Sequence, residues 1–131
     1  MSKPKNPKTG VHQTKEQERA KAAWECIEKH SDKLENYETV VSAAPAMIQN
    51  NGLGQTVAFY SAKNGQYYVD DLAYWLLMKY KGEQKERSKN LRLELIETLH
   101  SCSSEEYRFY TEEAMAFTGW LKRFASAKAK S

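Results

Sequence analysis

The most constraining feature of the sequence is an apolar seam near its C-terminal end. Six residues recur there at steps of three and four, which is the spacing of one face of an α-helix. They are Tyr107, Tyr110, Ala114, Phe117, Leu121 and Phe124. Ser103 or Ser104 can cap this helix, with Glu106 placed to complete a capping box. The seam therefore predicts a long helix that packs one side against a core.

Further helices are indicated upstream. Thr14 and Gln17 have the spacing of a capping box, so a first helix is expected to begin at Thr14. Its buried stripe is expected to comprise Ala20, Ala23, Trp24, Ile27 and Ser31. A second helix is expected from Leu34, and Pro45, which donates no backbone hydrogen bond, predicts that this helix restarts or kinks. The remaining helices are expected over residues 53–62, 67–80 and 90–102.

This pattern predicts an all-α fold, a compact single-domain bundle of about six helices, some of them short. The chain has 131 residues, which is enough for one domain with a modest core. β-branched residues are sparse and never alternate over a long run. We expect a disordered basic N-terminal tail over residues 1–13, a helical domain over 14–127 and a frayed C-terminus over 128–131.

The stretch from Ala44 to Phe59 stands out because it combines proline, glycine and amide residues and contains no charge. Gly52 is suited to the C-terminal cap of a helix. Gly52 and Gly54 invite comparison with a phosphate-binding loop, but that fingerprint needs a preceding strand, and a helix is expected here. We interpret the stretch as a joint between short helices. Its amide side chains either cap these helices or bind an anion beside the next helix N-terminus.

Positive charge is unevenly distributed along the chain. The net charge is +3, and the first ten residues hold three lysines and no acid. The last ten residues hold four basic side chains and no acid. A further basic block runs from Lys79 to Arg92. Contact with a polyanion would therefore be local rather than spread over the whole surface.

No catalytic or metal-binding set can be assembled with any specificity. Cys26 and His30 are four residues apart, but a structural zinc site needs four ligands. Glu97 and His100 match an element of di-iron bundles, which need a second such element that the sequence lacks. We therefore expect no enzyme activity, no metal, no cofactor and no small-molecule substrate.

The sequence favours a cytoplasmic protein that makes no membrane contact. Its first residues are polar and carry no apolar signal segment, and no apolar run is long enough to span a membrane. Its two cysteines, Cys26 and Cys102, do not form a disulfide framework, so we expect buried free thiols.

Two separated motifs resemble a known family. The first spans Pro45 to Phe59 and reads Pro-x-x-Ile-x-x-Asn-Gly-Leu-Gly-x-x-x-Ala-Phe. The second spans Glu113 to Ala125 and reads Glu-Ala-Met-Ala-Phe-x-x-Trp-Leu-Lys-Arg-Phe-Ala. With the alanine-rich first helix ahead of them, they resemble the small helical subunit of the type III-B CRISPR effector, the Cmr complex. The resemblance covers roughly residues 15 to 127.

The resemblance implies a non-catalytic subunit of an RNA-guided complex in antiviral defence. It implies three kinds of partner: other subunits of the complex, copies of the same chain stacked head to tail, and the guide and target RNA. Cleavage would belong to other subunits. Because base pairing reads the sequence, contacts to the RNA shape and backbone would be enough for this subunit.

Candidate site residues follow from the resemblance and the charge pattern together. The predicted RNA-binding residues are Lys15, Arg19, Lys63, Lys122, Arg123, Gln49 and Gln55. The predicted interface residues are Asn50, Asn51, Leu53 and Trp120. The alternative is a protein–protein scaffold without direct RNA contact, in which the basic residues only aid solubility.

Overall fold

The computed structural model describes residues 13–80 and 90–130 of the chain. Its α-helices are α1 (Lys15–Lys29), α2 (Leu34–Asn51), α3 (Leu53–Ala62), α4 (Gln66–Ala73), α5 (Leu91–Ser101) and α6 (Ser104–Ala129). A 3₁₀ turn, η1 (Ser31–Lys33), joins α1 to α2, and a π-helical segment, η2 (Tyr74–Tyr80), continues α4. The all-α prediction is confirmed. The expected N-terminal tail, up to residue 12, and residues 81–89 of the basic block lie outside the described residues.

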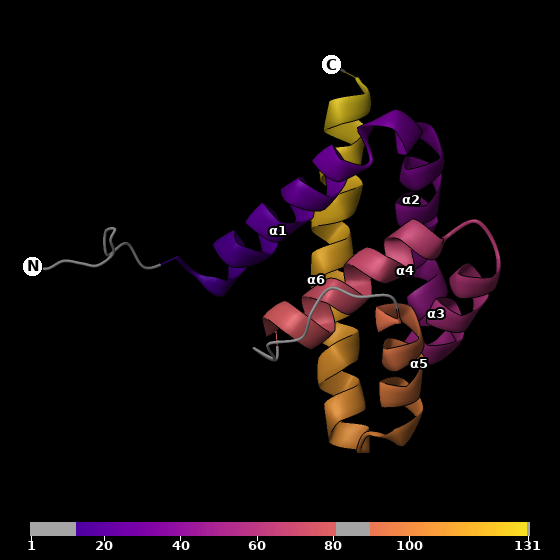
Figure 1. The fold of residues 1–131 in the computed structure, drawn as a ribbon. Coiled ribbons are helices and arrows are strands. Elements are labelled where there is room, and N and C mark those ends of the chain that lie inside the picture. The colour runs from indigo at the N-terminus through magenta and orange to yellow at the C-terminus, as the bar shows by residue number, and fades with distance from the viewer. Residues whose placement is uncertain (1–12, 81–89, 131) are drawn as a thin grey trace, which may run out of the picture.

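Helix α6 is the axis of the bundle. It spans the height of the molecule, with α1 crossing it on one side and α2 and α3 on the other (Figure 1). Its capping box forms as the sequence predicts, and the Ser103 hydroxyl accepts the Glu106 backbone N–H at 3.1 Å. The middle of the seam is buried, at Tyr110, Ala114, Phe117 and Leu121. The seam thus organises the fold as its periodicity indicates.

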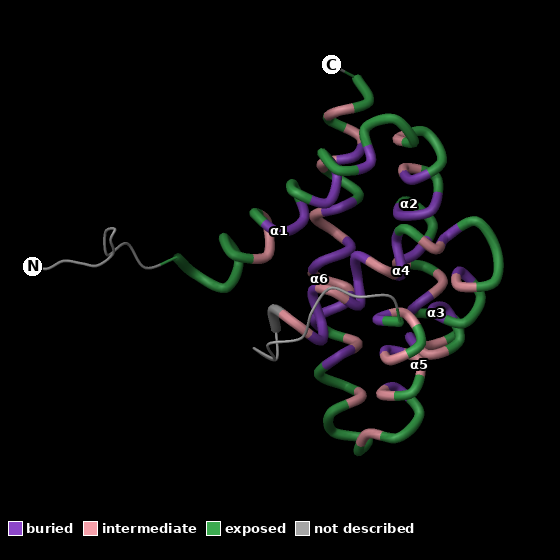
Figure 2. Tube along the Cα trace, in the orientation of Figure 1, coloured by how far each residue is buried: buried purple, intermediate pink, exposed green. Residues whose placement is uncertain are grey.

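The chain is largely buried where α4 and η2 cross α6 (Figure 2). The Trp75 indole stacks on the Phe117 ring with centroids 5.3 Å apart and planes 4° from parallel. The buried hydroxyls of Tyr68 and Thr118 are hydrogen-bonded at 2.8 Å. The helix expected over residues 67–80 forms as α4 and η2. Their change from α to π geometry at Tyr74 is a feature that the apolar pattern did not predict.

Helices α2 and α3 form an antiparallel hairpin. Helix α2 runs through Pro45 without a break, so the predicted restart there is wrong. The burial of one side of α2 from Tyr37 to Ile48 compensates for the hydrogen bond that proline lacks. The chain reverses at Gly52, whose backbone φ is 90°. Glycine adopts this conformation readily, whereas other residues rarely do. At the other end of the hairpin, the Asn36 side-chain amide donates to the Asn64 carbonyl at 3.3 Å.

Helix α1 begins with the predicted capping box, in which Thr14 accepts the Gln17 backbone N–H at 3.0 Å. Its buried side differs from the predicted stripe, because Ala22 and Cys26 are buried with Ala23 and Ile27. Trp24 is 36% exposed instead, and Ser31 is exposed too. Small side chains allow α1 to approach α6 closely, and this leaves the bulky indole at the edge of the contact.

The C-terminal end of α6 continues past the boundary expected at residue 127. The helix ends at Ala129. The Lys128 ammonium lies over the Trp24 ring, 5.6 Å from its centroid. This cation–π contact between α6 and α1 gives the last turn a partner in the fold.

Candidate nucleic-acid interface

The second half of α6 carries positive charge alone. Glu113 is the last acidic residue of the sequence. Beyond it, Lys122, Arg123 and Lys130 are exposed, and we call these three residues the basic face. Their directions around the helix axis span about 100°, because Arg123 and Lys130 are two turns apart and Lys122 is one residue from Arg123. None of them makes an ion pair within the described part of the chain.

A row of aromatic rings borders the basic face. Phe124 contacts Trp120 with ring centroids 5.2 Å apart, and it meets Trp24 of α1 edge-on at 5.3 Å. Trp120 and Phe124 are half-buried. Trp120, which lies off the seam, therefore packs against Phe124 of its own helix. Cations beside accessible aromatic rings are typical of surfaces that bind nucleic-acid strands.

Gly119 opens the same side of α6 to close approach. A Cβ atom added at Gly119 would have no other atom within 4 Å, apart from its own helix backbone. A glycine inside a helix costs about 1 kcal/mol relative to alanine, and nothing in the described fold fills the space in front of it. The backbone is therefore accessible here, one turn from Lys122 and Arg123.

Arg19, a predicted RNA contact, belongs to a buried cluster instead. Its guanidinium donates to both carboxylate oxygens of Glu113, one at 2.9 Å, and also to Glu16 at 2.8 Å. Glu113 also accepts the Trp75 indole N–H at 2.7 Å. The hydrogen bond to Glu113 raises the pKa of Arg19 against the effect of burial. We call Arg19, Glu113 and Trp75 the Glu113 cluster, and it joins α1, η2 and α6.

Lys15 lies at the edge of this cluster. Its ammonium is 5.8 Å from the Trp75 ring centroid and 3.9 Å from a Glu18 carboxylate oxygen. Lys15 therefore has partners within the chain, in contrast to Lys122 and Arg123. The structure separates the four basic residues that the sequence grouped together into a pair bound to the fold and a pair facing solvent.

The remaining predicted residues gather around the α2–α3 hairpin, apart from the basic face. Four of the amides and one lysine are exposed there: Gln49, Asn50, Asn51, Gln55 and Lys63. Leu53 is fully buried in the core, so its side chain is not available to a partner. The Gly54 N–H donates to the Tyr107 hydroxyl at 2.9 Å, which places this joint at the first turn of α6. Along α6, Tyr107 and Lys122 are about 22 Å apart.

A second buried cluster, around Asp71 of α4, was not predicted. Asp71 accepts hydrogen bonds from Lys29 at 2.9 Å and Tyr37 at 2.7 Å, and pairs with the His30 ring at 2.9 Å. Burial acts to raise the pKa of Asp71, but the hydrogen bond with His30 and the charge of Lys29 outweigh it and lower the pKa. Burial also raises the pKa of Tyr37 well above its ordinary value, which keeps the phenol a donor.

The Asp71 cluster serves the fold rather than a substrate. Its carboxylate is 1% exposed and surrounded by its partners, which leaves no position for a reacting group. Asp71 and His30 are 41 positions apart in the sequence, so no local motif indicates their contact. Two adjacent acidic residues, Asp70 and Asp71, within a largely apolar helix are the one signal that could have pointed to it.

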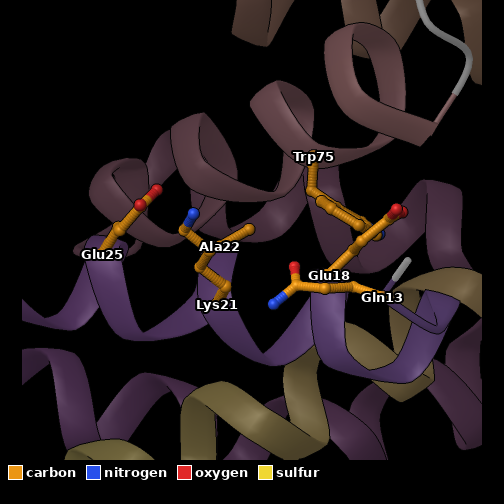
Figure 3. A pocket seen from close by; sticks show the side chains of 6 residues that line it. All are labelled: Gln13, Glu18, Lys21, Ala22, Glu25 and Trp75. Atoms are coloured by element: carbon orange, nitrogen blue, oxygen red, sulfur yellow. The ribbon is translucent and has the colours of Figure 1, made fainter. Parts of the chain in front are cut away.

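A pocket lies between α1 and η2 (Figure 3). Its volume is about 390 Å³, and its lining residues are Gln13, Glu18, Lys21, Ala22, Glu25 and Trp75. Trp75 enters it from η2 and Glu18 from α1 (Figure 3). The lining offers two carboxylates and an ammonium but no nucleophile with an adjacent base. Among the described residues, no group of three or more metal-ligating side chains gathers here or elsewhere.

These features define a small helical protein that presents surfaces to partners. None of the helices described is long and apolar enough to cross a membrane. The described residues combine a continuous core, two internal charge clusters and a basic, aromatic-bordered face on α6. Such a surface suits a subunit that assembles with other macromolecules.

Comparisons with known proteins identify the family. The family model described as CRISPR-associated protein (Cas_Cmr5) matches residues 15–128. The fold is similar to the crystal structure of a CRISPR-associated Cmr5 family protein from Thermus thermophilus, with a TM-score of 0.73 and 25% sequence identity. That similarity covers 88% of this chain and 97% of the other. The chain therefore belongs to the Cmr5 family, the small subunit of the type III-B Cmr complex.

Proposed function

We propose that this chain is a non-catalytic subunit that stacks with copies of itself in the cytoplasmic type III-B effector and contacts guide or target RNA in antiviral defence. In this proposal the RNA backbone runs along the basic face of α6, at Lys122, Arg123 and Lys130. Other subunits perform the cleavage. The chain contributes position and charge, and the base pairing of the guide supplies the sequence specificity.

The observation that carries the proposal is the contrast between paired and unpaired cations. Arg19 and Arg92 are each held by a carboxylate, Arg92 through two bonds to Asp70 at 2.9 and 3.0 Å. Lys122 and Arg123 have no such partner in the described chain, although they lie on the same molecule and face solvent. Unpaired cations release counterions when a phosphate backbone replaces the solution ions, and this favours binding.

Gly119 and the aromatic row support the same surface. The open backbone at Gly119 lets a phosphate or ribose approach α6 more closely than any side chain would allow. The Trp24 ring, 36% exposed, offers an apolar surface beside the charges. Contacts of this kind read shape and charge and do not depend on the base sequence.

A charge-reversal experiment in the assembled complex tests the proposal. The double variant Lys122→Glu/Arg123→Glu should assemble normally but retain target RNA more than about tenfold less tightly at moderate salt. Its plot of log affinity against log salt concentration should be shallower by about one unit per cation removed. Retention is measured by filter binding over a series of salt concentrations.

Arg108→Glu is the matched control, because Arg108 is an exposed arginine near the other end of α6. This variant should keep both the affinity and the salt slope of the unmodified complex. If the double variant assembles and retains RNA as the unmodified chain does, the basic face does not contact RNA. The chain would then be a protein–protein scaffold.

A further inference from the structure

Most of the exposed side of the α2–α3 hairpin carries no charge. No acidic, basic or histidine residue occurs between Thr39 and Ala62. The exposed residues include Ala43, Ala46 and Gln49 on α2, and Gln55, Ala58 and Phe59 on α3. The hydrogen bond between Asn36 and Asn64 holds the two helices side by side. We call the outward side chains of residues 40–61 the neutral face; exposed Glu35 and Lys63 border it.

The neutral face differs from the rest of the surface. Charged residues make up 28% of the sequence, and exposed ones recur along α1 and α6, as at Lys21, Glu28, Glu112 and Lys122. Exposed charge keeps a protein soluble. An exposed helical face that lacks charge therefore promotes aggregation unless another surface covers it. Depletion of charge is also the compositional feature of the centre of a protein–protein interface.

The side chains of this face suit a protein partner. Phe59 is 48% exposed, and its ring contacts Tyr60 edge-on, so it is held in place while one side stays in solvent. The amides of Gln49 and Gln55 make no hydrogen bond within the described residues. An aromatic anchor beside small alanines and free amides can pack closely and form hydrogen bonds at its edge.

We infer that the neutral face docks against an uncharged surface of a different protein subunit of the type III-B complex. RNA is not the occupant, because a phosphate backbone would bring negative charge to a face that offers no cation. The inference rests on the proposed function in one respect, namely that copies of the chain stack in a line.

The stacking of copies in a line decides whether the partner at the neutral face is a different subunit or a second copy of this chain. Stacking in a line requires contacts between two different patches of the same chain, since a face that pairs with itself closes the assembly at two copies. The second patch would also have to be uncharged. Across residues 13–80 and 90–130, the exposed sides of α1, α5 and α6 all include charged residues such as Glu25, Glu97 and Arg123. A subunit of different sequence therefore fits the neutral face better.

The test places either sign of charge on the neutral face. Ala46 and Ala58 are exposed helical positions, so replacing either with Glu or Lys leaves the fold intact. Against an uncharged partner surface, all four single variants should weaken incorporation into the reconstituted complex by more than about tenfold, because each buries an unpaired charge. Incorporation is measured by titrating the labelled chain into a complex assembled from the other subunits.

The sign of the effect identifies the occupant. If RNA covers the face, the Lys variants bind more tightly and the Glu variants more weakly, which overturns the inference. If a second copy covers it, the isolated chain loses self-association in sedimentation runs, which also overturns it. Leu93→Glu and Leu93→Lys, at a position 59% exposed on α5, are the controls and should incorporate normally. Failure of the proposed RNA contact would appear in RNA retention, whereas failure here appears in subunit incorporation.

Discussion

Glu113 and the basic face lie on one helix, α6, and their charges are used in opposite ways. At Glu113, each charge is matched: the carboxylate is 6% exposed and accepts from Arg19 and Trp75. Farther along α6, Lys122 and Arg123 are exposed and make no ion pair with any residue that the structure describes. The comparison shows that charges which hold the fold can be separated from charges available to a partner, although the sequence presents both as basic residues on amphipathic helices.

Breaking the Glu113 cluster should have the largest effect. Glu113→Gln removes the buried carboxylate charge opposite Arg19, and it leaves the guanidinium, whose side chain is 13% exposed, with the exposed Glu16 as its remaining counterion among the described residues. Loss of a partner from a largely buried ion pair is expected to lower the free energy of unfolding by about 3 kcal/mol. Urea denaturation followed by circular dichroism measures it. Glu112→Gln, at the exposed neighbouring position, should change stability little.

The Asp71 cluster should respond to pH. The pKa of Asp71 is lowered in the folded state. The stability that the Asp71 carboxylate contributes is therefore present above its unfolded-state pKa of about 4 and is lost as pH falls through its folded-state pKa. Asp71→Asn is expected to cost about 2 kcal/mol at pH 7. The stability difference between the two proteins should shrink toward pH 3. A difference that stays constant from pH 7 to pH 3 would contradict the assigned role.

Substitution of Gly119 should have the smallest effect on stability, and it tests the basic face rather than the Glu113 cluster. Because an added Cβ meets open space, Gly119→Ala should raise the free energy of unfolding by up to about 1 kcal/mol. The same variant should weaken RNA retention in the complex if the backbone at this position lies against RNA. Thermal denaturation and filter binding measure the two effects. A stabilised variant with unchanged RNA retention would remove Gly119 from the proposed surface.

Local signals predicted much of the fold. Both capping boxes, at Thr14 and Ser103, formed as expected, because they depend on residues three positions apart. The limits of α3, at residues 53–62, also agree with the prediction. Of the two outcomes expected at Pro45, the restart is wrong, because the burial of α2 against α6 outweighs the local cost of proline.

The candidate site was harder to predict, because it depends on which charges find partners across the fold. Arg19 and Arg123 look alike in sequence, and only the position of Glu113, 94 residues from Arg19, distinguishes them. Leu53 was grouped with its exposed neighbours, yet the turn at Gly52 directs it into the core. The neutral stretch was visible from the start, but its exposed side became clear only when α2 and α3 formed a hairpin.

Photocrosslinking of the assembled complex tests the central claim most directly. Target and guide RNA carrying photoreactive uridines would be bound, irradiated and digested, and the crosslinked peptides of this chain identified by mass spectrometry. The proposal predicts crosslinks in the second half of α6, between Ala114 and Lys130, and none between Thr39 and Ala62. Crosslinks confined to the α2–α3 hairpin, or none to this chain at all, would contradict it.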